Sequence, residues 1–138
     1  MELEQLTRTA YSKLRTAMMF YWCMHDPARS IAKAQEALSA ATEEHDSKTL
    51  YQSLGLSGLA LLDLARTKEA VQILFEIEKV VAARQPIVVG DETLFLERLS
   101  EHAKDSGTTT AIQRIAKTLW PVCRDPQFAQ RRKALART

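Results

Sequence analysis

Histidine, cysteine and acidic side chains are the groups of this chain that could hold a metal ion or transfer protons. The three histidines are His25, His45 and His102, and each adjoins an acidic residue. A zinc site needs three or four suitably spaced ligands, whereas the pair Cys23 and His25 supplies only two. The acidic residues around His45 are better explained as the end of one helix and the start of the next. We therefore predict no metal ligands and no cofactor.

Motifs of the common enzyme classes do not occur in the sequence. It contains no H-E-x-x-H, no G-x-S-x-G, no phosphate-binding loop and no G-x-G-x-x-G. The closely spaced Gly55 and Gly58 lie inside a predicted helix, without the strand that precedes a phosphate loop. We therefore predict that the protein is not an enzyme.

Basic residues are concentrated in the last quarter of the chain. Residues 106–138 carry seven basic side chains and one acid, although the net charge of the whole chain is only +2. Such a segment can bind phosphates or an acidic partner. The alternative is a solvated terminal helix whose bases lie near its own C-terminal dipole. The candidate basic contact residues are Arg124, Arg131, Arg132, Lys133 and Arg137.

The most apolar segment of the sequence runs from residue 18 to residue 24. It is too short to cross a bilayer, and no signal-peptide pattern follows it, so we expect a cytoplasmic protein without membrane contact. Two cysteines far apart in such a protein are expected to be reduced. A helix that is apolar on all sides must be covered on all sides. The candidate contacts with a partner or with a second copy are Met18, Met19, Tyr21 and Trp22.

Helices are the elements that must position these groups. Four glycines, four prolines and 46% hydrophobic residues favour long helices around one core. Apolar residues recur at helical spacing throughout, and no sustained alternation predicts a strand. We expect one all-helical domain over 1–138. Its predicted parts are helical hairpins at about 3–44, 47–84 and 91–120 and a C-terminal capping helix at 126–137.

Several local signals fix where these helices start and end. Asp26-Pro27 and Asp125-Pro126 each combine an N-cap side chain with a proline at the first helical position. Gly107 is expected to end a helix, and Thr108 to Thr110 to cap the next one. Gly55 and Gly58 weaken a helix interior, so we expect another helix to cross closely there.

A pattern of small and apolar residues recurs after 40 and then 41 residues. Such a period is typical of stacked helical hairpins that bury their apolar faces on one another. The repeated positions are Ser30, Ala34 and Ala37, then Ala70, Leu74 and Ile77, and finally Ala111, Ile115 and Thr118.

The middle unit resembles the tetratricopeptide repeat. Its first helix has Leu54, the small pair Ser57-Gly58 and Leu61, and its second helix has the small and apolar positions given above. The period exceeds the usual repeat of about 34 residues, so the helices are longer. The resemblance implies a short solenoid whose leading helices, the first, third and fifth, line a groove for a peptide or a partner helix.

These observations lead to one main hypothesis and three alternatives. The main hypothesis is an all-α protein of about six main helices and a short last one, stacked as a tetratricopeptide-like solenoid, that acts as a non-catalytic adaptor or small chaperone. A closed helical bundle is the alternative fold, because short connections make antiparallel neighbours in both. The alternative functions are a nucleic-acid-associated regulator that uses the basic C-terminus, and a structural homo-oligomer such as a homodimer.

Overall fold

The computed structural model of the chain describes residues 2–83, 90–102 and 104–137. Within these residues the chain is a stack of seven α-helices without a strand, as the sequence predicts. A π-helical turn, η1, continues the first helix, and a short 3-10 turn, η2, follows the sixth. The elements are α1 (Glu2–Met18), η1 (Met19–Cys23), α2 (Pro27–Glu44), α3 (Ser47–Asp63), α4 (Thr67–Ala83), α5 (Gly90–His102), α6 (Ser106–Leu119), η2 (Trp120–Val122) and α7 (Pro126–Arg137).

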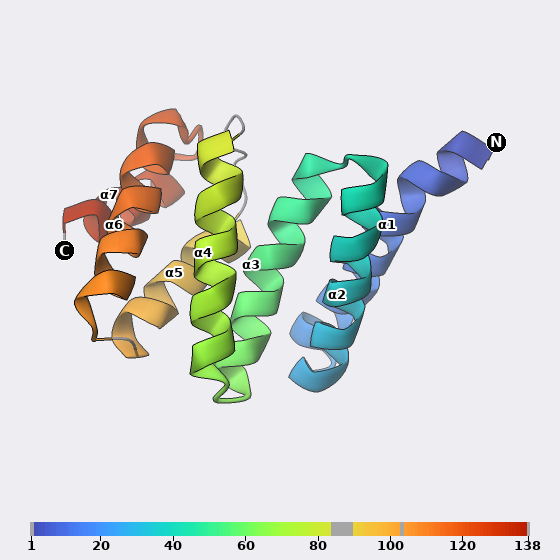
Figure 1. Cartoon of the computed structure of the whole chain (residues 1–138), viewed down its shortest axis with the longest axis horizontal. Coiled ribbons are helices and arrows are strands. Elements are labelled where there is room, and N and C mark those ends of the chain that lie inside the picture. The colour runs from blue at the N-terminus through green and yellow to red at the C-terminus, as the bar shows by residue number, and fades with distance from the viewer. Residues whose placement is uncertain (1, 84–89, 103, 138) are drawn as a thin grey trace.

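The helices form a stack with α1 at one end and α6 and α7 at the other, and α5 crosses behind α4 (Figure 1). The first four pack in chain order, α1 on α2, α2 on α3 and α3 on α4. After that the order changes, because α5 packs mainly on α3 and α6 packs on α4 and α7. The helices α5 and α6 contact each other far less than α1 and α2 do. The second half of the stack is therefore joined to the first mainly through helices that are not consecutive in the chain, α5 on α3 and α6 on α4.

Small side chains allow α1, α2 and α3 to approach closely. Ala17 of α1 and Ala34 and Ala37 of α2 are fully buried. The Ser30 hydroxyl at the start of α2 donates a hydrogen bond of 2.9 Å to the Ala17 carbonyl, which ties the two helices together. The repeated positions Ser30, Ala34 and Ala37 are thus part of the core.

Helix α5 packs closely against the glycines of α3, and the sequence predicts such a close helix crossing at these glycines. A Cβ atom on Gly58 would lie 2.5 Å from the Phe95 ring, and one on Gly55 would lie 3.0 Å from the Glu92 backbone nitrogen. Real Cβ atoms do not approach other atoms as closely as 2.5 Å, so this contact requires glycine. The first turns of α5 therefore lie directly against the backbone of α3.

Side-chain caps begin four of the helices in the described residues, and at α7 the Asp125 carboxylate accepts a 2.9 Å hydrogen bond from the Gln127 amide. The Asp26 carboxylate accepts a 3.1 Å hydrogen bond from the Arg29 amide, and Asp46 does the same for Thr49. Asp105, rather than one of the three threonines, caps α6 through the amide of Thr108 at 2.9 Å. The expectation that Gly107 ends a helix is wrong, since this glycine lies in the first turn of α6.

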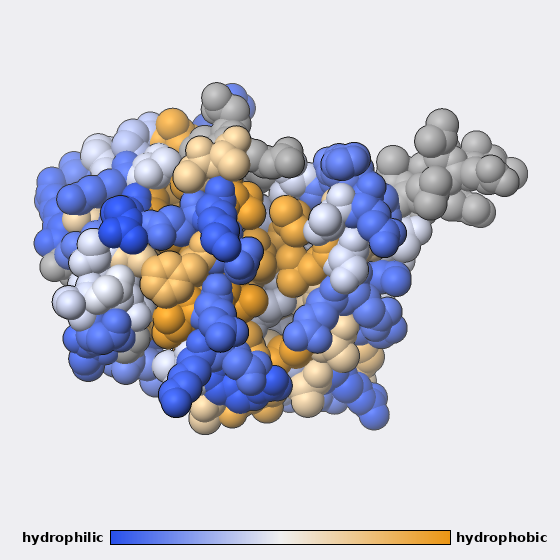
Figure 2. Space-filling model, in the orientation of Figure 1, coloured by the Kyte–Doolittle hydropathy of each residue, from blue (hydrophilic) through white to orange (hydrophobic). Residues whose placement is uncertain are grey.

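One face of the stack carries a band of apolar side chains between α4 and α2, where α3 lies behind them (Figure 2). In these helices the partly buried apolar residues pack against the core rather than stand clear of it. They include Leu38, Leu64, Val71, Ile73 and Val80.

Candidate functional site

The first helix has two apolar faces, and only one of them is buried. Ala10, Leu14, Ala17 and Tyr21 follow one another at helical spacing and face the core. Other residues of α1 and of the η1 turn that continues it form a second stripe that faces solvent. Its large side chains are Tyr11, Met19 and Trp22, which are 49%, 47% and 41% exposed.

The exposed stripe borders a shallow depression of about 330 Å³. We call the residues that line it the N-terminal surface: Tyr11, Arg15, Met18, Met19, Trp22 and Cys23. Three of the four residues predicted to contact a partner belong to it, namely Met18, Met19 and Trp22. The fourth, Tyr21, is only 6% exposed and lies behind it, so its aromatic face cannot meet a partner directly.

A π-helical turn gives the two neighbouring aromatic residues their opposite environments. The Met24 amide donates to the Met19 carbonyl at 3.0 Å, a bond that spans five residues rather than four. The wider turn leaves Tyr21 inside and Trp22 outside, with their rings edge to face at 4.7 Å. His25 then reverses the chain with a positive φ of 52°. Such π-helical turns are frequent at functional sites.

A second depression, of about 560 Å³, adjoins the N-terminal surface and shares Trp22 with it. It lies where η1, α3 and α5 end, so the three leading helices of the stack all contribute to it. We call it the polar cleft. Its lining residues are Tyr21, Trp22, His25, Pro27, Leu62, Asp63, Arg98, Glu101 and His102.

Three polar side chains form one wall of the polar cleft. Nη1 of Arg98 donates to the Tyr21 hydroxyl at 2.9 Å and lies 3.4 Å from the Asp63 carboxylate. Burial and, to a lesser degree, the nearby Asp63 carboxylate raise the pKa of Tyr21 to about 12. Tyr21 is therefore a neutral hydrogen-bonding group at any physiological pH, and through Arg98 it joins η1 to α5 and to Asp63 of α3.

His102 contributes an acceptor to the same cleft. Its Nδ1 lies 2.8 Å from the Arg98 carbonyl oxygen. A carbonyl oxygen can only accept, so Nδ1 carries the hydrogen, and when the ring is neutral its Nε2 is an acceptor. Neither histidine of the cleft belongs to a cluster of metal ligands, since the described residues contain no group of three or more suitable side chains.

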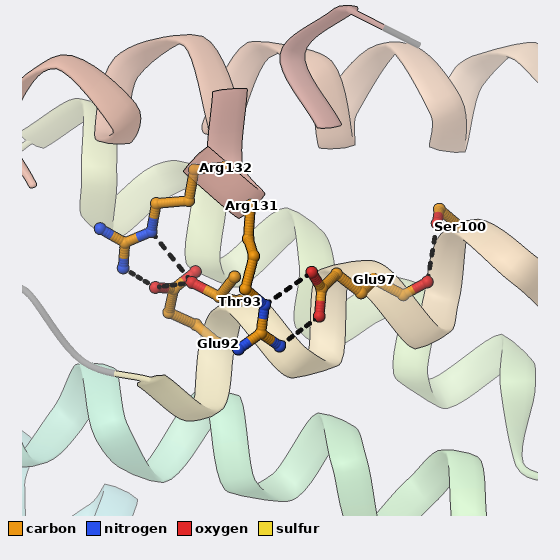
Figure 3. A network of polar contacts seen from close by, with 6 residues as sticks. All are labelled: Glu92, Thr93, Glu97, Ser100, Arg131 and Arg132. Carbon is orange, nitrogen blue, oxygen red and sulfur yellow. Dashed lines mark hydrogen bonds and ion pairs between the residues drawn. The ribbon is translucent and has the colours of Figure 1, made fainter. Parts of the chain in front are cut away.

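The basic residues of the C-terminal segment do not form one surface. Arg131 makes a two-pronged contact with the Glu97 carboxylate of α5, and Arg132 contacts Glu92 and Thr93 of the same helix (Figure 3). Arg132 is completely buried, which removes it from the predicted contact surface. The Lys133 ammonium lies 5.1 Å from the centre of the Trp120 ring. Arg124 and Arg137 alone of the five predicted residues are exposed.

The contact between Arg132 and Glu92 is a buried ion pair. Both side chains are inaccessible to solvent, and the Arg132 Nε donates to the Thr93 hydroxyl at 2.9 Å. Burial lowers the pKa of Arg132, but an arginine remains cationic in neutral solution. Removing only one charge of such a buried pair strongly destabilises a protein, because the other charge is left buried without a partner. The pair therefore fixes where α7 docks on α5.

Apart from Tyr21 and Trp22, which were predicted as partner contacts, the sequence did not indicate the residues of the polar cleft. Asp63, Arg98 and Glu101 come from two helices, and each looks like an ordinary polar position of an amphipathic helix. The one available signal was their place near the ends of leading helices, which the tetratricopeptide resemblance associates with a binding groove. Only the packing of α5 on α3 brings them together with Tyr21.

Comparison with known proteins identifies no relative. No family model matches the chain, and no curated protein and no solved structure shows significant similarity to it. No helix of the described residues is long and apolar enough to span a membrane. The function must therefore be inferred from the surfaces themselves.

Proposed function

We propose that this protein is a non-catalytic interaction module, an adaptor or small chaperone, that binds a helix or peptide of a partner protein across the N-terminal surface. The supporting observation is where the exposed apolar side chains lie. Among residues 9–83, 91–102 and 104–137, whose side chains are described, six large apolar side chains are exposed; four of these belong to residues 11–24, and only Phe75 and Val122 lie elsewhere. They are Tyr11, Met19, Trp22 and Met24.

Contiguous exposed apolar side chains on a soluble protein commonly mark an interaction site. The stripe of Tyr11, Met19 and Trp22 has the spacing of one helix face, which is how a helix packs on an amphipathic partner helix. Methionine also adapts to irregular partner surfaces because its side chain is unbranched and polarizable. A cytoplasmic location belongs to the same proposal, and the two free cysteines are compatible with it.

A photo-crosslinking amino acid placed at position 11 or 19 in the native cell tests the proposal. We expect discrete adducts whose second chain is the same at both positions by mass spectrometry. The same amino acid at position 75, where Phe75 is similarly exposed on α4, is the matched control and should not give that adduct. Equal adducts at all three positions, or none at 11 and 19, would contradict the proposal.

A structural homo-oligomer is the second candidate, because a second copy could cover the same apolar stripe. Its adduct would have twice the mass of the chain, and light scattering would show a mass that rises with concentration. A nucleic-acid-associated role has weaker support, since Arg131 and Arg132 are already paired with acids of α5. Absence of electrophoretic binding to nucleic acid at low salt would exclude it.

A further inference from the structure

The polar cleft continues the N-terminal surface, because Trp22 lines both depressions. A partner segment that lies along Tyr11 and Met19 and passes the Trp22 ring therefore arrives at the cleft. Resting on the proposed function, we propose that the cleft binds the cationic side chain, lysine or arginine, of that partner segment.

The backbone around the cleft favours a positive charge. The segments η1, α3 and α5 end at Cys23, Asp63 and His102, so all three direct their carbonyl ends toward this region. Each helix C-terminus carries a partial negative charge of about half a unit. The N-terminus of α2 also lies here, but the Arg29 amide of its first turn already donates a 3.1 Å hydrogen bond to the Asp26 carboxylate.

The side chains add to this preference. Asp63 and Glu101 are the acidic residues of the lining, and Arg98 is its one permanent cation among the described residues. With neutral histidines the lining therefore carries a net charge of −1. Arg98 is held against Tyr21 and Asp63, and that pair of contacts neutralises Asp63 rather than Glu101.

Glu101 is the acid that remains available. It is exposed on the last turn of α5, and no ion pair or hydrogen bond joins it to another described residue. Trp22, whose indole face attracts cations, and His102 line the same cleft. A lysine or arginine side chain can thus meet a carboxylate, an aromatic face and a neutral acceptor.

A carboxylate ligand is disfavoured by the same features. It would have to approach Glu101, Asp63 and three helix carbonyl ends, and its cationic partner, Arg98, is already engaged. The charges therefore distinguish the two ligand classes.

Binding of small acetylated amino-acid amides to the full chain tests the inference without knowledge of the partner. The probes are N-acetyl-arginine methylamide, its lysine counterpart, the uncharged citrulline isostere and N-acetyl-glutamate methylamide. In a Trp120→Phe background the indole N–H of Trp22 is the single tryptophan signal in an NMR titration. We expect saturable shifts with arginine and lysine, and binding about tenfold weaker for citrulline, as the loss of a charge-assisted hydrogen bond predicts.

Two variants with matched chemistry locate the effect. Glu101→Gln should weaken arginine binding about two- to fivefold, the range for an exposed ion pair, and added salt should reduce the difference. Glu76→Gln, which removes an exposed acid of α4 paired with Lys79 at 3.3 Å, should leave binding unchanged. Equal binding of arginine and citrulline, tighter binding of glutamate, or no saturable shift would overturn the inference.

This experiment and the crosslinking experiment fail independently. The amides need no partner protein, and the crosslinking positions 11 and 19 are not part of the cleft. Adducts at 11 and 19 without arginine binding would reject the cation site alone, whereas arginine binding without adducts would reject the interaction surface.

Discussion

The two ends of the stack differ in how their terminal faces are covered. At the C-terminal end α7 lies over α5 and α6, buries Leu135 and Ala136, and joins α5 through Arg131 and Arg132. At the other end the outer face of α1 leaves Tyr11, Met19 and Trp22 exposed. A stack of helices needs a cover at both ends. At the C-terminal end α7 covers the stack, and we infer that a partner covers the exposed face at the N-terminal end.

The largest expected effect concerns the covered end. Arg132→Met leaves Glu92 buried without its cation, so we expect the free energy of unfolding to fall by about 3–5 kcal/mol. Urea denaturation followed by circular dichroism measures it. Combining Arg132→Met with Glu92→Met should recover most of the loss, because two apolar groups often replace a buried pair at little cost. Arg124→Met, at an exposed position, is the control and should change stability by less than about 0.5 kcal/mol.

The junction between the two ends can be disrupted at α3. Gly58→Ala places a methyl group 2.5 Å from the Phe95 ring, and such overpacking should destabilise the protein by about 1–3 kcal/mol. Gly107→Ala is the matched control, because the nearest atom there is 3.5 Å away and the glycine lies in a helix. That substitution should stabilise the protein by about 0.4–1 kcal/mol. Equal losses for both glycines would contradict the close crossing of α3 and α5.

The uncovered end should respond to alkaline pH through Tyr21. Its pKa is raised to about 12 in the folded protein, so the unfolded chain loses this proton first as pH increases. Stability is therefore retained below the ordinary tyrosine pKa of about 10, and about 1 kcal/mol should be lost by pH 11. The Tyr21→Phe variant should lack this part of the decrease, while its difference from the parent stays constant between pH 7 and pH 9. Identical alkaline slopes in urea titrations would contradict the assignment.

The smallest effect on stability belongs to the N-terminal surface. Met19→Gln changes an exposed side chain, so we expect a change of less than about 0.5 kcal/mol in the free energy of unfolding. The same substitution should remove the crosslinked adduct formed from position 11. Leu135→Ala provides the opposite case, because truncating a buried leucine typically costs about 2–5 kcal/mol. A large loss of stability in Met19→Gln would show that this side chain belongs to the core.

Much of the fold could be predicted because its signals are local. Asp26-Pro27 starts α2 with the predicted cap, and Gly55 and Gly58 mark where another helix crosses. The cap of α6 was missed because an aspartate and three threonines compete within a few residues. Asp105 is in the position from which a carboxylate reaches the Thr108 amide.

The sites depend on distant partners and were therefore harder to predict. Consecutive basic residues look like one charged face, yet successive positions of a helix point in different directions, about 100° apart. Arg132 consequently points inward to Glu92, whereas Arg131 meets Glu97 nearer the surface. Neither acid is marked by any local pattern. The polar cleft likewise depends on residues that are distant in the sequence, since its wall is formed by Tyr21, Asp63 and Arg98 from three helical segments.

The ion pair between Arg132 and Glu92 also has a consequence during synthesis. Glu92 emerges from the ribosome well before Arg132 does, and until then its carboxylate has no cation to accompany it into the interior. An incomplete chain that ends between the two residues would have to leave α5 hydrated or bury an unmatched charge. Burial of α5 during synthesis therefore depends on α7, although the two helices are far apart in the sequence.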